Sequence, residues 1–268
     1  MTTETKTAST AAIIIIGNEI LSGRTPDANL AWLGHQLNLA GVRLVETRII
    51  RDIEEEIIST VQDLSPKYDY IFTTGGIGPT HDDITAESMA KAFDIEIEMN
   101  DEAVRQMEAY YGEKLTEARS RMARIPVGAT LIENSVSGAP GFIIDNVHVM
   151  AGVPRIMQGM FKTILPTLAG GLPMLSSTVA CSMQESEIAL PLAEIQKEYP
   201  NVDIGSYPHF RGGLLGLSVV LRATEEDALA QATKTVIELI RSLGGEPRAI
   251  TLRDQEDEDP LPATFHHV

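Results

Sequence analysis

The 268-residue sequence predicts an α/β protein with a three-layer α/β/α domain followed by a smaller α+β domain. The continuous apolar, β-branched run at 11–16 is typical of a strand buried on both faces of a parallel sheet. Segments with apolar residues at helical spacing alternate with such runs, which is the pattern of βαβ units with right-handed crossovers. The sequence Gly170-Gly171-Leu172-Pro173 is the clearest candidate for a domain boundary.

The elements of the first domain follow in order. The strand at 11–16 ends at Gly17, and a helix over 30–37 is expected between the N-cap Asp27 and the stop at Gly41. Asp52 and Glu55 have the spacing of a capping box at the start of the next helix. The same alternation predicts strands at 42–50, 70–73 and 95–99, helices at 53–64, 85–93, 101–121 and 155–168, and a hairpin of strands 142–144 and 147–150.

The remainder predicts a smaller domain in β-α-β-β-α order, with strands at 177–182, 202–207 and 214–223 and helices at 185–198 and 224–243. The first domain is assigned to 12–170 and the second to 171–250, with a disordered tail at 1–11 and an acidic tail at 251–268. A domain of about 75 residues is near the lower limit of independent stability. We therefore expect a homo-oligomer, with a dimer as the first candidate.

The acidic composition limits the possible partners. Asp and Glu number 38 against 21 Lys and Arg, which gives a formal charge of −17. Such a charge argues against nonspecific binding to nucleic acid or to an anionic membrane. The single cysteine, Cys181, cannot form an internal disulfide, and the N-terminal residues lack the basic start of a signal peptide. A cytoplasmic location is the expectation.

The segment 73–85, TTGGIGPTHDDIT, carries the strongest chemical signal. Its glycines lie between a buried strand and a helix, where backbone N–H groups and the helix dipole favour an anion. The adjacent pair Asp82-Asp83 would repel a phosphate unless a cation such as Mg²⁺ lies between them. The alternative is that both aspartates only cap the helix that begins near Thr85. The residues leave the two interpretations open.

Four further segments fall where strands end or loops gather, at the usual ligand edge of an open α/β sheet. Each is also explained as a turn or a helix cap, but together they would form a pocket built from several loops. They are 17–19, 23–29, 134–141 and 152–154.

These motifs resemble a known family. GNEILSG at 17–23, DAN at 27–29, the glycine loop, NSVSGAPGF at 134–142 and AGVP at 151–154 are similar to the molybdopterin-binding domain of molybdenum-cofactor biosynthesis proteins. They resemble more closely the N-terminal part of CinA-type competence/damage-inducible proteins, and the segment 204–208 is similar to part of their small second domain. The resemblance implies a Rossmann-like first domain with a nucleotide or pterin pocket. It also implies hydrolysis of the ADP-ribose pyrophosphate with a divalent metal (Mg, Mn or Co) and potassium.

The site residues follow from the matched motifs. The resemblance implies catalytic roles for Asp83, Asp82 and Asp52 and metal ligation by Glu19, Asp82 and Asp83. Arg121 is the preferred candidate for a phosphate clamp. The residues expected to bind substrate are Gly17, Asn29, Thr74, Gly75, Gly76, Gly78, Thr80, Arg121, Asn134, Gly138, Pro140, Gly141, Gly152 and Pro154.

The sequence also departs from the family pattern. CinA-type chains commonly carry an acidic residue two positions after the last proline of this motif, where this chain has Ile156, and Asn18 stands where Asp is usual. Their C-terminal deamidase domain is not found in these 268 residues. The expected function is therefore a metal-dependent nucleotide-sugar pyrophosphatase with ADP-ribose favoured. The alternatives are a noncatalytic molybdopterin- or nucleotide-binding module, or adenylyl transfer in molybdenum-cofactor biosynthesis.

The small domain has a second interpretation as a KH-like, RNA-binding module, because Gly213-Leu214-Leu215-Gly216 has the G-x-x-G form. In KH domains that loop joins two helices, whereas here it enters a predicted strand. The acidic composition also argues against RNA, so a small nucleotide or pterin is the expected ligand.

Overall fold

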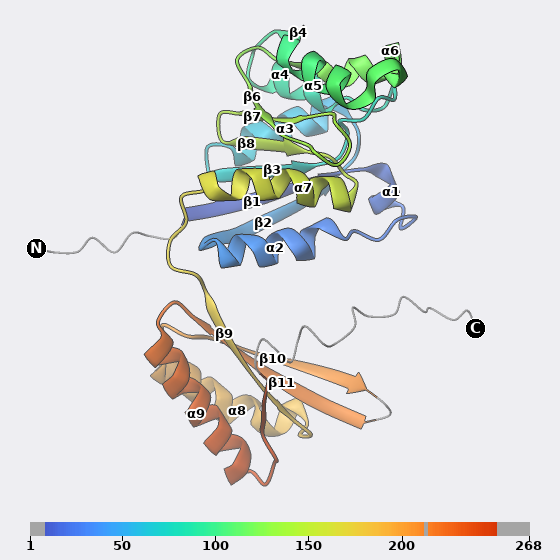
Figure 1. The fold of residues 1–268 in the computed structure, drawn as a ribbon. Coiled ribbons are helices and arrows are strands. Elements are labelled where there is room, and N and C mark those ends of the chain that lie inside the picture. Colours follow the sequence, from blue (N-terminus) through green and yellow to red (C-terminus); the bar gives the residue numbers. More distant parts are fainter. Residues whose placement is uncertain (1–8, 212–213, 251–268) are drawn as a thin grey trace, which may run out of the picture. The chain divides into compact units, whose positions relative to one another are not determined.

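The computed structural model describes residues 9–211 and 214–250, and the chain divides after Pro173 into two compact units (Figure 1). The predicted tails at 1–8 and 251–268 lie outside the described residues, as does Gly213 of the G-x-x-G segment. Residues 9–11 belong to the first strand, so the N-terminal tail predicted over 1–11 is wrong at its end. No helix among the described residues is long and apolar enough to cross a membrane.

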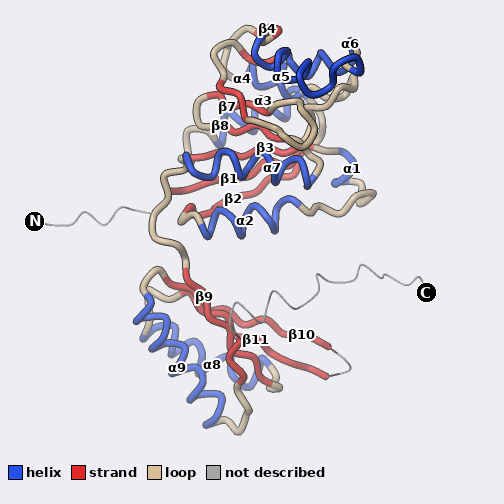
Figure 2. Tube along the Cα trace, in the orientation of Figure 1, coloured by secondary structure: helices blue, strands red, loops and turns tan. Residues whose placement is uncertain are grey.

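The first unit is built on a six-stranded sheet, shown in red in Figure 2, with strand order β2-β1-β3-β8-β7-β6. The strands β2, β1, β3 and β8 run parallel to one another, whereas β7 is antiparallel to both β8 and β6. The predicted α/β class is therefore confirmed. The strands are β1 (Ser9–Ile16), β2 (Val42–Ile50), β3 (Tyr70–Thr74), β6 (Thr130–Ile132), β7 (Gly141–Ile144) and β8 (Val147–Met150).

Helices cover both faces of this sheet. They are α1 (Asn18–Leu21), α2 (Asn29–Leu39), α3 (Glu54–Leu64), α4 (Thr85–Ala92), α5 (Asp101–Tyr111), α6 (Glu117–Ser120) and α7 (Pro154–Ile164). A two-stranded ribbon of β4 (Ile97–Met99) and β5 (Arg124–Pro126) accompanies them.

Strand β1 is the centre of two cores. Its residues Ala11, Ile13 and Ile15 pack with α2 and α7, whereas the alternate residues Ala12, Ile14 and Ile16 pack with α3, α4 and α5. None of the six is more than 3% exposed. Full burial stabilises by roughly 1.5–3 kcal/mol for each isoleucine. The continuous apolar run thus has the burial on both faces that the sequence predicts.

The second unit has a four-stranded antiparallel sheet in the order β10-β11-β9-β12. Its elements are β9 (Leu175–Cys181), α8 (Glu185–Glu198), β10 (Asp203–Arg211), β11 (Leu214–Ala223), α9 (Glu226–Ser242) and β12 (Arg248–Ile250). Both helices pack on the sheet through one apolar core. The predicted β-α-β-β-α order is confirmed. Strand β12 is additional, because a strand of three residues is too short to show a pattern in the sequence.

Three local predictions are wrong. The long helix expected over 101–121 ends at Tyr111, because Gly112 has a positive φ of 53°, and continues as 3₁₀ turns and the short α6. The helix expected over 155–168 ends at Ile164, and a 3₁₀ turn containing Pro166 follows. Helix α3 has Ile53 as its N-cap with no side-chain cap, so Asp52 is not its capping residue.

Candidate functional site

The loops that follow β1, β3 and β8 meet at the carboxyl edge of the parallel strands (Figure 1). Strand β1 lies between β2 and β3, so the chain leaves β1 toward one side of the sheet and returns on the other. Such a switch point opens a crevice where ligands bind in open α/β sheets. The glycine loop after β3 lies at this position.

Close backbone contacts fix the glycine loop. Gly75 and Gly76 have positive φ angles of 111° and 67°. A Cβ on Gly75 would overlap the carbonyl oxygen of Ile16, and one on Gly76 would overlap Thr85 Oγ1. The Thr85 hydroxyl donates to Gly75 O at 3.0 Å, and the Thr85 N–H donates to Gly76 O at 3.0 Å. Both positions therefore require glycine, and Thr85 anchors the loop to the start of α4.

Asp83 closes the turn between the loop and α4. Its Oδ2 accepts hydrogen bonds from the Thr80 N–H at 2.8 Å and the Thr80 hydroxyl at 2.5 Å. A Cβ on Gly78 would lie 2.5 Å from the same oxygen. Helix α4 has Ile84 as its N-cap with no side-chain cap. The alternative that the aspartates cap this helix is therefore wrong, and Thr80 positions the Asp83 carboxylate.

Asp82 lies further out, with a side chain that is 68% exposed. The Thr80 hydroxyl and the backbone N–H of Asp82 lower the pKa of this carboxylate. The carboxylate is ionised at neutral pH.

A narrow cleft brings together segments that are far apart in the sequence. The glycine loop contributes Gly76 and Gly78 to its lining, and Asp83, Arg121 and Pro140 line it with them. Two further lining residues, Glu87 and Arg124, form an ion pair at 3.0 Å. The neighbouring Arg119 instead stacks on the ring of Tyr111 at 4.7 Å. Of the three arginines, Arg121 and Arg124 therefore line the cleft, and Arg121 stays the predicted phosphate clamp.

The first helical turn after β1 lies beside this edge. The Asp52 carboxylate accepts a hydrogen bond from the Asn18 N–H at 2.8 Å, which gives it a structural role in holding α1. A Cβ on Gly17 would lie 2.6 Å from Glu19 Oε1, so the glycine leaves room for that carboxylate.

The predicted metal ligands do not form a complete site. Among residues 9–211 and 214–250, no three His, Cys, Asp or Glu side chains form a group that could hold a metal ion, so Glu19, Asp82 and Asp83 do not form one. Asp82 and Asp83 are nevertheless adjacent oxygen donors. Mg²⁺ is commonly held by one or two carboxylates together with substrate phosphates and waters, and this pair fits that requirement.

The α2 and α7 side of the same edge contains Asn29, Gly152 and Pro154. The Asn29 amide Nδ2 donates to Gly152 O at 2.8 Å. A Cβ on Gly152 would lie 3.2 Å from the Cα of Gly75, so this loop packs on the glycine loop. Pro154 is the first residue of α7. The structure therefore joins Asn29 and Gly152 to the glycine loop, as the sequence predicts.

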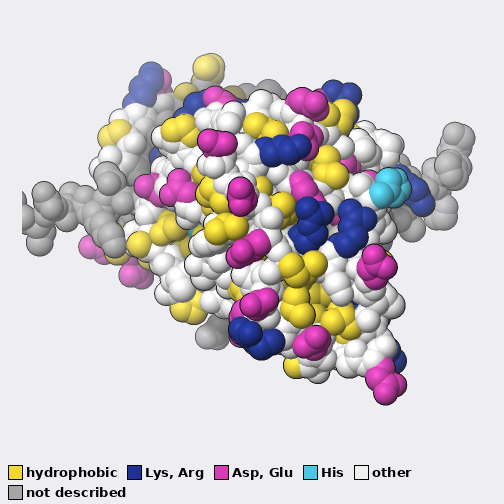
Figure 3. All heavy atoms as spheres, turned by 90° about the horizontal axis from the view of Figure 1, so that it is seen from above, with side chains coloured by type: hydrophobic (Ala, Val, Ile, Leu, Met, Phe, Trp, Pro, Cys, Tyr) yellow, Lys and Arg dark blue, Asp and Glu magenta, His cyan; other side chains and the backbone are white. Residues whose placement is uncertain are grey.

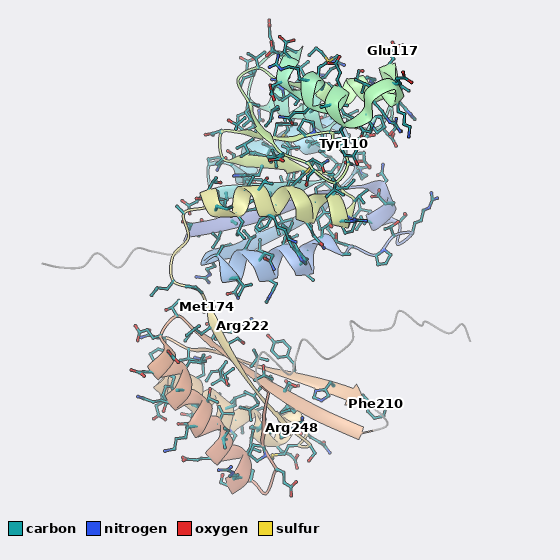
Figure 4. All side chains as sticks on the ribbon, in the orientation of Figure 1. Tyr110, Glu117, Met174, Phe210, Arg222 and Arg248 are labelled. Carbon is teal, nitrogen blue, oxygen red and sulfur yellow. The ribbon has the colours of Figure 1, made fainter. Side chains whose placement is uncertain are left out.

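Asn134 and Gly138 line a different cleft, together with Tyr110 of α5. Tyr110 is labelled in Figure 4. Asn134 donates to Ala139 O and to Ser137 Oγ at 2.7 Å, and its Oδ1 accepts two backbone N–H bonds. The Tyr110 hydroxyl donates to Val136 O at 2.8 Å. The placement of these residues in one pocket with the glycine loop is therefore wrong, because Asn134 shapes its own loop.

Gly141 begins strand β7 and allows its close pairing with β8. A Cβ on it would overlap the carbonyl oxygen of Val149 in the paired strand β8. The residues that the sequence prediction missed are Thr85 and the tyrosines Tyr110 and Tyr111. Thr85 belongs to the recognised motif, but nothing in the sequence indicates that the two tyrosines bind the 134–139 loop.

Acidic side chains are spread over the face shown in Figure 3, with Lys and Arg side chains among them. The negative charge therefore does not form one continuous patch on this face.

Comparisons with known proteins assign the two units separately. Residues 12–170 match the family described as a probable molybdopterin binding domain, and residues 173–244 match the middle domain of FAD synthase. A protein of Pyrobaculum arsenaticum is 34% identical over 255 residues, covering 89% of this chain and 96% of that protein. A protein of Aeropyrum pernix is 33% identical over 256 residues, covering 88% and 95%.

A solved structure is also similar. The protein CinA with unknown function from Thermoplasma acidophilum is 33% identical, with a TM-score of 0.57. The match covers 60% of this chain and 98% of that chain. With the parallel sheet, the glycine loop and the sequence match over 12–170 all in agreement, this chain belongs to the molybdopterin-binding domain family and is similar to CinA-type proteins.

Proposed function

We propose that this protein is a metal-dependent hydrolase that cleaves the pyrophosphate bond of a nucleotide sugar, with ADP-ribose as the first substrate to test. The observation that supports this is the single cleft lined by Gly76, Gly78, Asp83 and Arg121. It combines glycine backbone, a guanidinium and a carboxylate, which are the groups needed to bind a diphosphate together with a cation.

Different residues of the chain are proposed to bind the phosphates, to hold the metal ion and to position its ligand. The glycine loop and Arg121 would bind the phosphate oxygens, and Asp83 and Asp82 would hold the divalent ion. Thr80 keeps the Asp83 carboxylate in place through its two hydrogen bonds. When bound, the ion neutralises phosphate charge and lowers the pKa of a bound water. Water adds to one phosphorus and the bridging P–O bond breaks, giving AMP and ribose 5-phosphate.

The experiment is release of AMP from ADP-ribose with Mg²⁺, Mn²⁺ or Co²⁺ in the presence of potassium. We expect turnover by the native chain and its loss in Asp83→Asn. Thr80→Val should lower kcat and leave the fold intact. Asp94→Asn is the matched control, because Asp94 is an exposed aspartate outside the cleft that already has the positive φ of 54° that asparagine tolerates.

The same assay separates the alternatives. If ADP-ribose raises the Tm but no metal supports its hydrolysis, the protein is a noncatalytic nucleotide-binding module and the hydrolase proposal is wrong. If AMP is instead transferred from ATP to molybdopterin, adenylyl transfer replaces hydrolysis.

A further inference from the structure

Two buried polar atoms at the ligand edge have no hydrogen-bond partner among the described residues. They are Asn29 Oδ1 and Thr74 Oγ1. Asn29 is 5% exposed and Thr74 is 1% exposed, so bulk water does not satisfy them. A buried amide oxygen or hydroxyl without a partner is unfavourable, and native proteins contain few of them.

Both residues belong to the α2 and α7 side of the glycine loop. Asn29 opens α2, and its hydrogen bond to Gly152 O places the amide beside the exposed Gly152, just before α7. Because Nδ2 faces that carbonyl, the opposite amide atom is the acceptor Oδ1. Thr74 directly precedes Gly75, on the face of β3 where Phe72 contacts Phe161 of α7.

The diphosphate cleft extends along α4 instead, since Ala86 and Glu87 of that helix line it with Asp83. The glycine loop contributes to both sides: Gly76 and Gly78 line the cleft, and Gly75 contacts Gly152. The glycine loop thus connects the cleft with the side of the edge where Asn29 and Thr74 lie.

The chemistry of the two atoms selects what binds there. An ionised diphosphate offers only acceptors, so it cannot satisfy Asn29 Oδ1. A group with adjacent O–H donors can, and each of the two phosphates of ADP-ribose is esterified to a ribose that carries such hydroxyls. We infer, on the basis of the proposed function, that Asn29 and Thr74 form a subsite for the hydroxyl groups of a ribose attached to the diphosphate. Asn29 and Thr74 then determine specificity for ribose over deoxyribose.

The test measures binding rather than turnover. Calorimetric Kd values are determined with Mg²⁺ for AMP, 2′-deoxy-AMP, 3′-deoxy-AMP, inosine monophosphate and inorganic pyrophosphate. We expect the native chain to prefer AMP over at least one deoxy analogue by about 3- to 10-fold, the effect of one net hydrogen bond. Thr74→Val should remove this preference and leave the pyrophosphate Kd unchanged.

Thr73→Val is the matched control. Thr73 Oγ1 is equally buried and unpartnered, but its side chain faces the opposite side of β3, with Ile71. Removing either unpartnered hydroxyl should leave the Tm unchanged or raise it. Only Thr74→Val should change the ratio of AMP to deoxy-AMP affinity.

Several results would overturn the inference. They are an unchanged ratio in Thr74→Val, an equal change in Thr73→Val, a lower Tm in Thr74→Val, or discrimination against inosine monophosphate in place of the deoxy analogues. The last would assign the donor to a base amine. Loss of ADP-ribose turnover with every metal would refute the hydrolase but leave the subsite standing. Turnover with no ribose preference would refute the subsite alone.

Discussion

Thr85→Val should destabilise the first unit by removing a hydrogen bond that anchors the glycine loop. The side chain is fully buried, and its hydroxyl donates to Gly75 O at 3.0 Å. Valine keeps the shape but removes the donor, so the Gly75 carbonyl loses this partner in a buried position. Leaving a buried acceptor unpaired costs about 1–3 kcal/mol. For a unit of this size, about 2 kcal/mol corresponds to a fall in Tm of roughly 4–8 °C.

The single tryptophan makes the first unit observable by itself. Trp32 lies in α2 and packs edge-on against Phe161 at 5.6 Å between ring centroids. Its fluorescence therefore reports unfolding of the first unit without a contribution from the second. Thermal and urea denaturation followed at this residue give the change in stability directly.

Two variants complete the experiment. Thr85→Ser retains the hydroxyl and should recover most of the lost stability. Ser88→Ala removes a hydroxyl whose acceptor, Ile84 O, also receives the Ser88 backbone N–H, so it should change the Tm little. A Thr85→Val Tm within 1 °C of the native value, or a Thr85→Ser value as low as that of valine, would refute the reasoning.

Three other predictions use the same fluorescence. Gly75→Ala should destabilise by at least about 3 kcal/mol, since its φ of 111° and its contact with Ile16 O both exclude a Cβ; near-native stability would contradict the loop geometry. Asn134→Ala should lower the free energy of unfolding by about 3 kcal/mol, because it removes four hydrogen bonds that shape the 134–139 loop. A decrease below about 1 kcal/mol would show that the loop keeps its conformation without these bonds. Burial lowers the pKa of His148 below its usual 6.5, so its contribution to stability is constant above pH 6.5 and is lost as the pH falls below that value, by up to about 1.4 kcal/mol per pH unit. His148→Phe should be less sensitive to acid over this range, and equal slopes for the two proteins would refute the assignment.

The sequence predicted the elements whose pattern is local. The run at 11–16 and the helical stripe at 53–64 are each determined by their own spacing of apolar residues, and both are found within two residues of their predicted limits. The predicted helix over 101–121 failed because Gly112 adopts a left-handed conformation that helical charge spacing does not reveal.

In the candidate site, likewise, some positions follow from the strand topology and others depend on contacts between residues far apart in the sequence. Loops that follow neighbouring parallel strands must meet at one edge, so the proximity of Gly75 and Gly152 follows from topology. The 134–139 loop follows no parallel strand, and its position depends on hydrogen bonds from Tyr110 and Tyr111 across a long sequence separation. Asp52 is similar, because a carboxylate just before a helix gives no sign that its partner is the Asn18 N–H.

The contact of Gly75 with Ile16 O on one side and with Gly152 on the other is made by bare backbone. Because Gly75 combines this close contact with a positive φ, a side chain at that position cannot adjust the shape of the crevice gradually and would instead disrupt it. A library that randomises the crevice should therefore return glycine at position 75 and diversity at exposed residues around it, such as His81 and Arg155. New ligand preferences in this scaffold are therefore expected from substitutions at the exposed residues around the crevice, and not from substitution of Gly75.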